Sequence, residues 1–390
     1  MDHHTVSEKC LLHNAIYVIN NKNAGNGEKE RKYLMRKKIL SVILALAMLA
    51  CMLPLGGIVA FAESSFAGGD GSESDPYQIS TLEQLTALAE EVNDVTDYSG
   101  TYFILTDDIG ELNDDGTVKA GLETPIGNGC CFAGNFDGDG HTVVLNMSKS
   151  SDCYFGLFGN IANGGTVSDV ITAGIVSGSA GASMFGGICG YLDDGCTITG
   201  CTNKATVTGE DGACQFAGIC GYNNIGTLAD CKNTANITGE NANTFGGICG
   251  HNYKDAVIRN CGNSGIITGS GSCYEFGGVC GHNAGTIENS ANSGSVAGIN
   301  ASQFGGIAGA NYSSVKDCCN FGSVEGVNSS SFAGISGFSG SSTADGTSGD
   351  ISASVNTGSV SGDENSEDFG AVCGVFDDEI KISKKKKKNK

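Results

Sequence analysis

The chain is 390 residues long, with 61 glycines, 3 prolines, no tryptophan and only 17% charged residues. Low charge with abundant Gly, Thr, Val and Ile is typical of short strands joined by tight turns. It excludes intrinsic disorder, which needs high charge and few aliphatic side chains. The formal net charge of −21 repels nucleic acid and anionic lipid, so we expect neither as a partner.

The N-terminal region predicts export. Arg36, Lys37 and Lys38 form a basic segment before an apolar run over 39–59, and the small residues Ala60 and Ala62 follow. This layout is typical of a secretory signal peptide. A transmembrane anchor is one alternative, because the apolar run is long enough to span a bilayer. A lipoprotein cleavage site at 48–51 is the other.

Four regions follow from this interpretation. We expect 1–62 to be a misassigned leader plus signal peptide, and 63–110 an N-terminal cap. Repeats occupy 111–378, and a lysine-rich tail occupies 379–390. The mature protein is therefore expected to be secreted or exposed on the cell surface, with no membrane insertion after signal cleavage.

The cap contains the one convincing helix of the mature chain. Residues 77–79 and 101–105 read as strands, and Ser80 to Glu83 reads as a capping box before a helix over 81–94. Leu85, Leu88 and Val92 recur at helical spacing. Because the open end of a solenoid needs a cover that differs from the repeat, this segment is predicted to cap one.

The next two segments lead into the repeats. Residues 107–121 read as an acidic loop. Residues 125–147 read as the first coil, with strands around Phe132 and over 142–145 on either side of a glycine-rich turn.

The remainder repeats with a period close to thirty residues. Successive aromatic anchors are separated by 31, 31, 29, 31, 28, 28 and 37 residues. These anchors are Tyr154, Phe185, Phe216, Phe245, Phe276, Phe304, Phe332 and Phe369. A period of this size indicates a solenoid, a propeller or an array.

Each repeat reads as three short strands with glycine at the bends. One strand covers the F-[GA]-G-[IV]-C-G segment, one is centred on aliphatic residues such as Ile198, and one covers A-x-V-x-G. Propeller blades are longer and carry aromatic signatures. The sequence therefore predicts an all-β fold, a right-handed parallel β-helix of about eight coils.

Several positions stay chemically constant when the repeats are aligned. Cysteine recurs at 189, 220, 249 and 280, and again at 201, 231, 261 and 318. Asparagine recurs at 203, 233, 263, 292, 320 and 356, with Thr172 in the first repeat. Residues one coil apart lie about 4.8 Å from each other, so buried asparagines are expected to form a hydrogen-bonded ladder.

These segments carry a resemblance. The opening GGDGSESDPYQISTLEQLTALAEEVN, then FAGNFDGDGHTVVLNM and YFGLFGN, resemble bacterial cell-surface proteins with GLUG-motif repeats, over about 66–378. The motif takes its name from secreted IgA-specific metallopeptidases and is common in adhesin-like proteins. The resemblance implies a stalk or scaffold, because the H-E-x-x-H zinc motif of a peptidase is missing.

A carbohydrate-active β-helix enzyme, a polysaccharide lyase or hydrolase, is the alternative function. It needs a cluster of carboxylates with a basic residue, or a converging pair of Asp or Glu. The acidic residues scatter over turns and Arg259 has no visible partner cluster. We therefore expect no catalytic residue, no cofactor and no enzymatic activity.

Two other patterns have structural and functional interpretations. Residues 135–140 match half of a calcium loop, but Asn146 stands where a bidentate Glu belongs, which favours a simple turn. The 16 cysteines of the mature chain fit buried packing thiols better than a disulfide framework. The pairs 130–131 and 318–319, and Cys153, Cys214 and Cys273 outside the ladders, are the candidates for oxidation.

One row of side chains is a candidate contact surface. Tyr191, Tyr222, His251 and His282 follow the C-G dipeptide, and Ala310 and Phe338 continue the position. Such rings can stack on sugars, hold a metal between the two histidines, or simply stack on each other. We predict no metal site here. We expect an adhesin-like or scaffolding solenoid whose partner is a glycan or a host or cell-surface protein.

Overall fold

The computed structural model describes residues 66–151, 153–342 and 347–376. The predicted signal peptide and the lysine-rich tail lie outside these residues. The chain divides into two units, 1–63 and 64–390, and only the second is described below. In the described part, no helix is long and apolar enough to cross a membrane.

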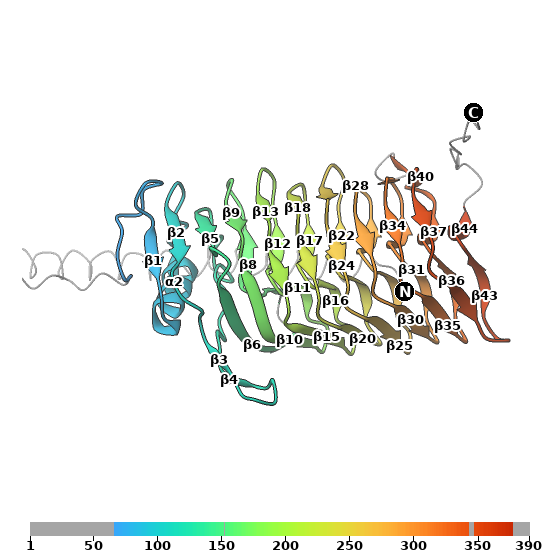
Figure 1. The fold of residues 1–390 in the computed structure, drawn as a ribbon, viewed down its shortest axis with the longest axis horizontal. Coiled ribbons are helices and arrows are strands. Elements are labelled where there is room, and N and C mark those ends of the chain that lie inside the picture. Colours follow the sequence, from blue (N-terminus) through green and yellow to red (C-terminus); the bar gives the residue numbers. More distant parts are fainter. Residues whose placement is uncertain (1–65, 152, 343–346, 377–390) are drawn as a thin grey trace, which may run out of the picture. The chain divides into compact units, whose positions relative to one another are not determined.

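The described unit is a parallel β-helix, as the sequence predicts. Its strands form four parallel sheets that run along the stack of coils, as Figure 1 shows. Sheet 1 has ten strands, sheet 2 has fourteen, and sheets 3 and 4 have eight each. Eight complete coils contribute to sheets 3 and 4, which confirms the predicted number.

The bounds of the strands follow the repeat. Sheet 1 contains β1 (Tyr77–Ile79), β2 (Tyr102–Leu105), β5 (Asn135–Asp137), β9 (Thr166–Ser168), β13 (Thr197–Thr199), β18 (Thr227–Ala229), β23 (Val257–Arg259), β28 (Thr286–Glu288), β33 (Ser314–Lys316) and β40 (Asp350–Ser352). Sheet 2 contains β6 (Thr142–Ser150), β10 (Ile171–Ser179), β14 (Thr202–Asn203), β15 (Thr206–Glu210), β19 (Lys232–Asn233), β20 (Ile237–Glu240), β24 (Gly262–Asn263), β25 (Ile267–Ser270), β29 (Ala291–Asn292), β30 (Val296–Ile299), β34 (Cys319–Asn320), β35 (Val324–Val327), β41 (Val355–Asn356) and β42 (Val360–Gly362).

The other two sheets come from the F-[GA]-G-[IV]-C-G segments. Sheet 3 contains β7 (Cys153–Phe155), β11 (Ser183–Gly186), β16 (Cys214–Ala217), β21 (Asn243–Gly246), β26 (Tyr274–Gly277), β31 (Ser302–Gly305), β36 (Ser330–Ala333) and β43 (Glu367–Gly370). Sheet 4 contains β8 (Phe158–Ile161), β12 (Cys189–Leu192), β17 (Cys220–Asn223), β22 (Cys249–Asn252), β27 (Cys280–Asn283), β32 (Ala308–Asn311), β37 (Ser336–Ser339) and β44 (Cys373–Phe376).

A typical coil has five strands rather than the three predicted. The F-[GA]-G-[IV]-C-G segment bends between β11 and β12, and the asparagine position forms the short strand β14. The bend occurs at a glycine because a Cβ on Gly187 would lie 2.1 Å from Oδ1 of Asn203. The backbone therefore approaches the asparagine ladder more closely than any side chain allows.

The N-terminal segment is a strand, a helix and a strand, as predicted, and the helix and the second strand each begin one residue later than expected. The helix α2 (Leu82–Asp94) buries Leu85, Leu88 and Val92. Its N-cap is Thr81, whose side chain accepts a hydrogen bond from Gln84 N, and Gln84 Oε1 accepts one from Ser80 N at 2.8 Å. The predicted capping box at Ser80 is therefore wrong by one residue.

The segment before the first full coil differs from the prediction. The loop at 107–121 contains an antiparallel hairpin, β3 (Glu111–Leu112) and β4 (Val118–Ala120). Around Phe132 the chain makes only an isolated bridge to Ile161, and the strand starts at Asn135. A second hairpin, β38 (Ser341–Ser342) with β39 (Thr347–Ser348), lengthens the spacing before the last anchor to 37 residues.

Stacked phenylalanine rings fill the core of the helix. Phe155, Phe185 and Phe216 follow each other with centroids 4.6 and 4.8 Å apart and nearly parallel planes. Phe155, rather than the predicted Tyr154, therefore begins this column. Both residues are aromatic and adjacent, and only the register Ser183↔Cys153 and Phe185↔Phe155 shows which one points inward.

The predicted asparagine ladder is present and buried. Asn203 Nδ2 donates to Asn233 Oδ1 at 2.8 Å, and Asn233 Nδ2 donates to Asn263 Oδ1 at 2.7 Å. The series continues through Asn292 and Asn320 to Asn356. Each amide from Asn203 to Asn320 also donates to a turn carbonyl of its own coil, as Asn203 does to Ala205 O, so that both of its N–H groups are satisfied.

A second asparagine ladder runs along sheet 4 and was not predicted. Asn223 Nδ2 donates to Asn252 Oδ1 at 3.0 Å, and Asn252 Nδ2 donates to Asn283 Oδ1 at 2.9 Å. Asn283 then donates to Asn311, which donates to Ser339 Oγ. The preceding coil has Leu192 at this position, so Asn223 Oδ1 is buried without a hydrogen-bond partner.

Candidate functional site

The predicted ring residues lie on the outer side of sheet 4. Along β12 the side chains of Cys189 and Leu192 are buried, whereas Tyr191 is partly exposed. Tyr191 pairs in register with Tyr222, Tyr222 with His251, and His251 with His282. Because identical positions of successive coils are adjacent, the four rings form one continuous row.

These rings stack on one another. The centroids of Tyr191 and Tyr222 are 5.5 Å apart at an interplanar angle of 11°. Tyr222 and His251 are 4.8 Å apart, and His251 and His282 are 4.3 Å apart at 25°. The rings therefore cover each other's faces and present their edges outward.

The row is longer than the sequence indicates. Ala310 holds the next register position but is buried, and the ring of Tyr312, two residues later, stacks on His282 at 4.8 Å. Phe338 follows at 5.5 Å from Tyr312. At the other end, Tyr154 meets Tyr191 edge to face at 5.5 Å.

We call this row the aromatic stripe. It consists of Tyr154, Tyr191, Tyr222, His251, His282, Tyr312 and Phe338. Tyr253 borders it, 6.0 Å from His251. All of these side chains are partly exposed.

A column of left-handed residues borders the stripe on the side of sheet 3. In each coil the residue before the anchor Phe has a positive φ, including 56° at Met184 and 58° at the β-branched Thr244. Such a conformation costs on the order of 1–3 kcal/mol in a residue other than glycine. It is tolerated here because the neighbouring strand has a glycine: a Cβ on Gly190 would lie 2.5 Å from Met184 O.

This column supplies a polar contact to the stripe. Glu275 is buried, and its Oε2 lies 3.1 Å from Nδ1 of His282. Thr244 Oγ1 donates to the same oxygen at 3.3 Å. The carboxylate therefore fixes the orientation of the His282 ring within the stack.

Two tyrosines of the stripe, Tyr191 and Tyr312, are neutral at physiological pH. Burial, followed by the negative charge of Asp193, raises the pKa of Tyr191. Burial also raises the pKa of Tyr312 to about 12, with a smaller effect of Glu275. The phenol groups can therefore donate hydrogen bonds at the outer edge of the stripe.

The geometry argues against a metal between the two histidines. The lone pairs of an imidazole lie in its ring plane, so two rings stacked at 4.3 Å direct them side by side rather than toward one point. Over the residues that the structure describes, no group of three His, Cys, Asp or Glu side chains is placed to hold a metal ion.

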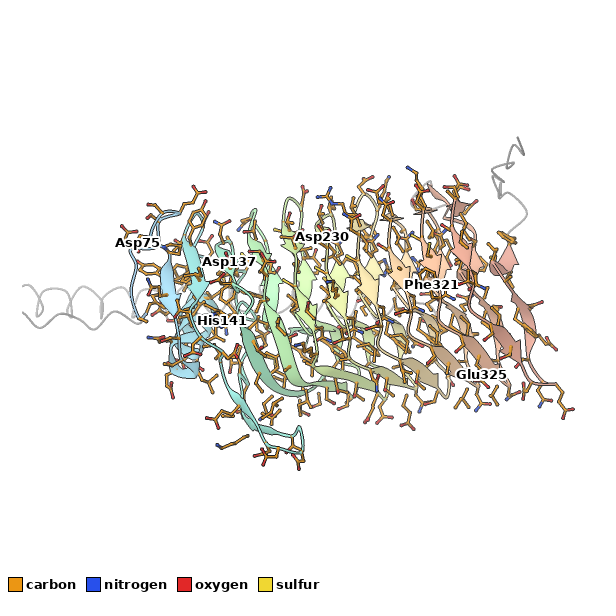
Figure 2. The ribbon with its side chains drawn as sticks, in the orientation of Figure 1. Asp75, Asp137, His141, Asp230, Phe321 and Glu325 are labelled. Atoms are coloured by element: carbon orange, nitrogen blue, oxygen red, sulfur yellow. The ribbon has the colours of Figure 1, made fainter. Side chains whose placement is uncertain are left out.

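The half-matched calcium loop is a turn. Asn135 to Asp137 belong to β5, and Asp137 Oδ1 accepts a hydrogen bond from Asp139 N at 2.9 Å. The Asp137 side chain therefore caps its own turn, as Asx turns do. Figure 2 shows Asp137 and, further along the stack, Asp230, whose Oδ1 accepts from Asn260 Nδ2 at 3.2 Å.

The cysteines of the repeats are free thiols that pack in columns. Cys189, Cys220, Cys249 and Cys280 are in register and fully buried. Burial raises the pKa values of Cys220, Cys249 and Cys280 well above the ordinary value, so these three thiols are poor nucleophiles.

The cysteines interpreted as off-ladder also belong to columns. Cys153 and Cys214 pair in register with Ser183. Cys273 is buried, as are Ala242 and Ala301 at the equivalent positions. Cys318 is buried too, and every cysteine of the described residues, including Cys130, Cys131 and Cys319, is a free thiol.

Comparison with known proteins identifies the repeat. Residues 181–208, which include β11 to β14, match the family model of the GLUG motif. Residues 181–208 therefore form a repeat of the GLUG type, and the strand register extends the same columns to the other coils. No curated protein matches the chain.

A solved structure of similar topology is a "putative immunoglobulin A1 protease" from Bacteroides ovatus, with a TM-score of 0.44 and 20% identity. The match covers 79% of this chain and 87% of that one. A likeness this distant carries no conclusion about activity.

Proposed function

We propose that the chain is an exported, non-catalytic β-solenoid that acts as an adhesin-like or scaffolding protein and contacts a host or cell-surface protein through the aromatic stripe. The observation that carries the proposal is the stripe itself. Its rings follow one another from Tyr154 to Phe338 and remain partly exposed. Aromatic side chains at this level of exposure are enriched in protein interfaces.

The stacking supports a protein partner rather than a glycan. A sugar ring packs on the face of an aromatic ring. In the stripe the faces of Tyr222 and His251 are covered by their neighbours, at 4.8 Å between them and 4.3 Å from His251 to His282. Ring edges and phenol groups remain for contact, and these suit a protein surface with backbone acceptors.

The regularity of the coils supports the absence of catalysis. An active site on a β-helix needs converging acidic groups. Here acidic side chains at the turns accept hydrogen bonds from nearby residues of the solenoid. Asp193 Oδ1, for example, accepts one from Asn224 Nδ2 at 2.9 Å. Arg259 lies on β23 and pairs in register with Ala229 and Glu288, so one of its two register partners is acidic.

The test is binding of the purified mature chain to intact epithelial cells. A double variant, Tyr191→Ser with Tyr222→Ser, removes two rings of the stripe, and Ile299→Ala removes an apolar side chain of 44% exposure on sheet 2. We expect the double variant to lose binding and the control to retain it. Binding should also be lost when the cells are treated with protease but not with glycosidases.

Two results would overturn the proposal. One is unchanged binding by the double variant, and the other is loss of binding after glycosidase treatment alone. Because removing rings also removes packing, thermal unfolding of each variant is measured in parallel. The pair Tyr191→Phe and Tyr222→Phe keeps the stack and removes only the hydroxyl groups, so it distinguishes lost contacts from a damaged fold.

A further inference from the structure

A polar groove lies at the bend between sheets 2 and 3, in the C-terminal half of the repeats. Its volume is about 430 Å³, within the range of small-molecule sites. The side chains that matter for its chemistry are Ser272, Tyr274, Asn300, Asn328, Asn365 and Glu367.

Differences in turn length produce this groove. In the coil of Phe276 the anchor Phe follows the buried aliphatic residue of sheet 2, Ile267, by nine residues. In the coils of Phe304 and Phe332 it follows the equivalent valine by only eight residues. The coil of Phe369 again has nine. Two short turns therefore lie between two longer ones, and the longer turns form the rims.

In the strands of sheet 3 below these turns, small side chains likewise lie between two larger ones. Tyr274 pairs in register with Ser302, Ser302 with Ser330, and Ser330 with Glu367. Two small side chains thus form the floor between a tyrosine and a glutamate. Three steps of about 4.8 Å place the two ends roughly 14 Å apart.

The turns around the groove are held by hydrogen bonds. Asn328 Nδ2 donates to Asn300 Oδ1, and Asn328 N donates to Asp363 Oδ1 at 2.9 Å. Ser366 Oγ donates to the same carboxylate oxygen. Beneath them Ser329 is buried, and its hydroxyl donates to Gly298 O at 3.1 Å. The groove is therefore formed before any ligand binds, which lowers the entropic cost of binding.

The lining indicates the class of ligand. Three asparagine amides, several serine hydroxyls and one carboxylate offer donors and acceptors at short intervals, next to one aromatic ring. Among the residues that the structure describes, none that lines the groove is basic, and Glu367 stands at its end, so an anionic ligand is disfavoured. We propose that the groove binds an uncharged saccharide, with a sugar ring against Tyr274 and its hydroxyls bonded to Asn300 and Asn328.

This inference goes beyond the proposed contact of the stripe and does not depend on it. The test is titration calorimetry of the purified mature chain with lactose, cellobiose and N,N′-diacetylchitobiose, and with 3′-sialyllactose as the anionic comparison. We expect at least one neutral disaccharide to bind and the anionic sugar to bind more weakly.

A matched pair of variants locates the site. Ser302→Tyr continues the Tyr274 column by one coil and fills the floor, whereas Asn243→Tyr extends the same column on the other side of Tyr274, outside the groove. Ser302→Tyr should weaken the Kd at least about tenfold, the effect of losing one important contact. Asn243→Tyr should leave the Kd unchanged.

The inference is wrong if no neutral disaccharide binds, or if Ser302→Tyr binds as the wild type does. The double stripe variant, Tyr191→Ser with Tyr222→Ser, should bind saccharide normally. Loss of cell binding in that variant with intact saccharide binding supports both proposals. Cell binding through the stripe without any saccharide binding overturns only the groove.

Discussion

The Oγ1 of Thr172 lies 2.9 Å from Oδ1 of Asn203 and donates its hydrogen to it. Both side chains are fully buried. Thr172 stands one coil before the first asparagine, in the register of the ladder. It therefore gives Asn203 Oδ1 the hydrogen bond that later asparagines of the ladder receive from the preceding coil, in addition to the one that this oxygen accepts from Ala205 N at 3.0 Å.

Thr172→Val should destabilise the protein by about 1 kcal/mol, because it keeps the shape but removes one of the two hydrogen bonds that the buried Asn203 Oδ1 accepts, leaving only the one from Ala205 N at 3.0 Å. The free energy of unfolding in urea measures the effect. Thr172→Ser retains the hydroxyl and serves as the control. A valine variant as stable as the serine variant would show that the ladder needs no donor at its start.

In the second ladder, replacing asparagine by leucine should reduce the free energy of unfolding more at position 252 than at position 223. Asn223→Leu moves the start of the ladder by one coil, so one unpartnered carbonyl replaces another. Asn252→Leu instead removes both the acceptor of Asn223 Nδ2 and the donor to Asn283 Oδ1. Urea unfolding should find Asn252→Leu less stable than Asn223→Leu by about 1–3 kcal/mol. Equal stabilities would contradict the ladder as a cooperative element.

Gly187 is predicted to tolerate no side chain. A Cβ there would lie 2.1 Å from Asn203 Oδ1 and 2.4 Å from Gly218 O. Gly187→Ala should therefore cost about 3 kcal/mol through overpacking. Gly262→Ala is the control, since nothing lies within 4 Å of its Cβ position and it should stay within about 1 kcal/mol of the wild type. Thermal unfolding compares the two, and similar melting temperatures would refute the close approach.

The buried thiols predict a loss of stability in alkaline solution. Burial raises the pKa of Cys249 well above its ordinary value of 9.0. Below about pH 9 the thiol is protonated in both states, and above it only the unfolded state loses its proton. The free energy of unfolding should therefore fall as the pH rises above about 9. A constant or rising value between about pH 8 and about pH 11 would contradict this.

Much of the fold could be predicted because each coil repeats the same physical requirements. The spacing of the Phe anchors gives the coil length, and the recurring Asn203 position gives a buried ladder. Tyr154 was misassigned because it adjoins Phe155, and sequence spacing alone cannot tell which of two adjacent rings faces inward. The bend at Gly187 depends on a contact with Asn203, which lies in a different segment of the coil.

The site could be predicted only in part. Tyr191 and Tyr222 follow from the register, whereas Tyr312 reaches the stripe from two residues beyond the expected position, beside the small Ala310. The groove had a signal in the sequence, the two consecutive spacings of 28 residues that end at Phe304 and Phe332. Its meaning required knowing that one of the missing residues lies in the turn above Ser302.

The most direct test of the proposed function is photo-crosslinking from within the stripe. Tyr222 is replaced by p-benzoylphenylalanine, and Phe321, which is 57% exposed and labelled in Figure 2, is replaced in the same way as an aromatic control away from the stripe. Both proteins are irradiated on intact epithelial cells. The proposal predicts a covalent adduct with a cell-surface protein from position 222 and none from position 321. Adducts from position 321 alone, or equally from both positions, would contradict it.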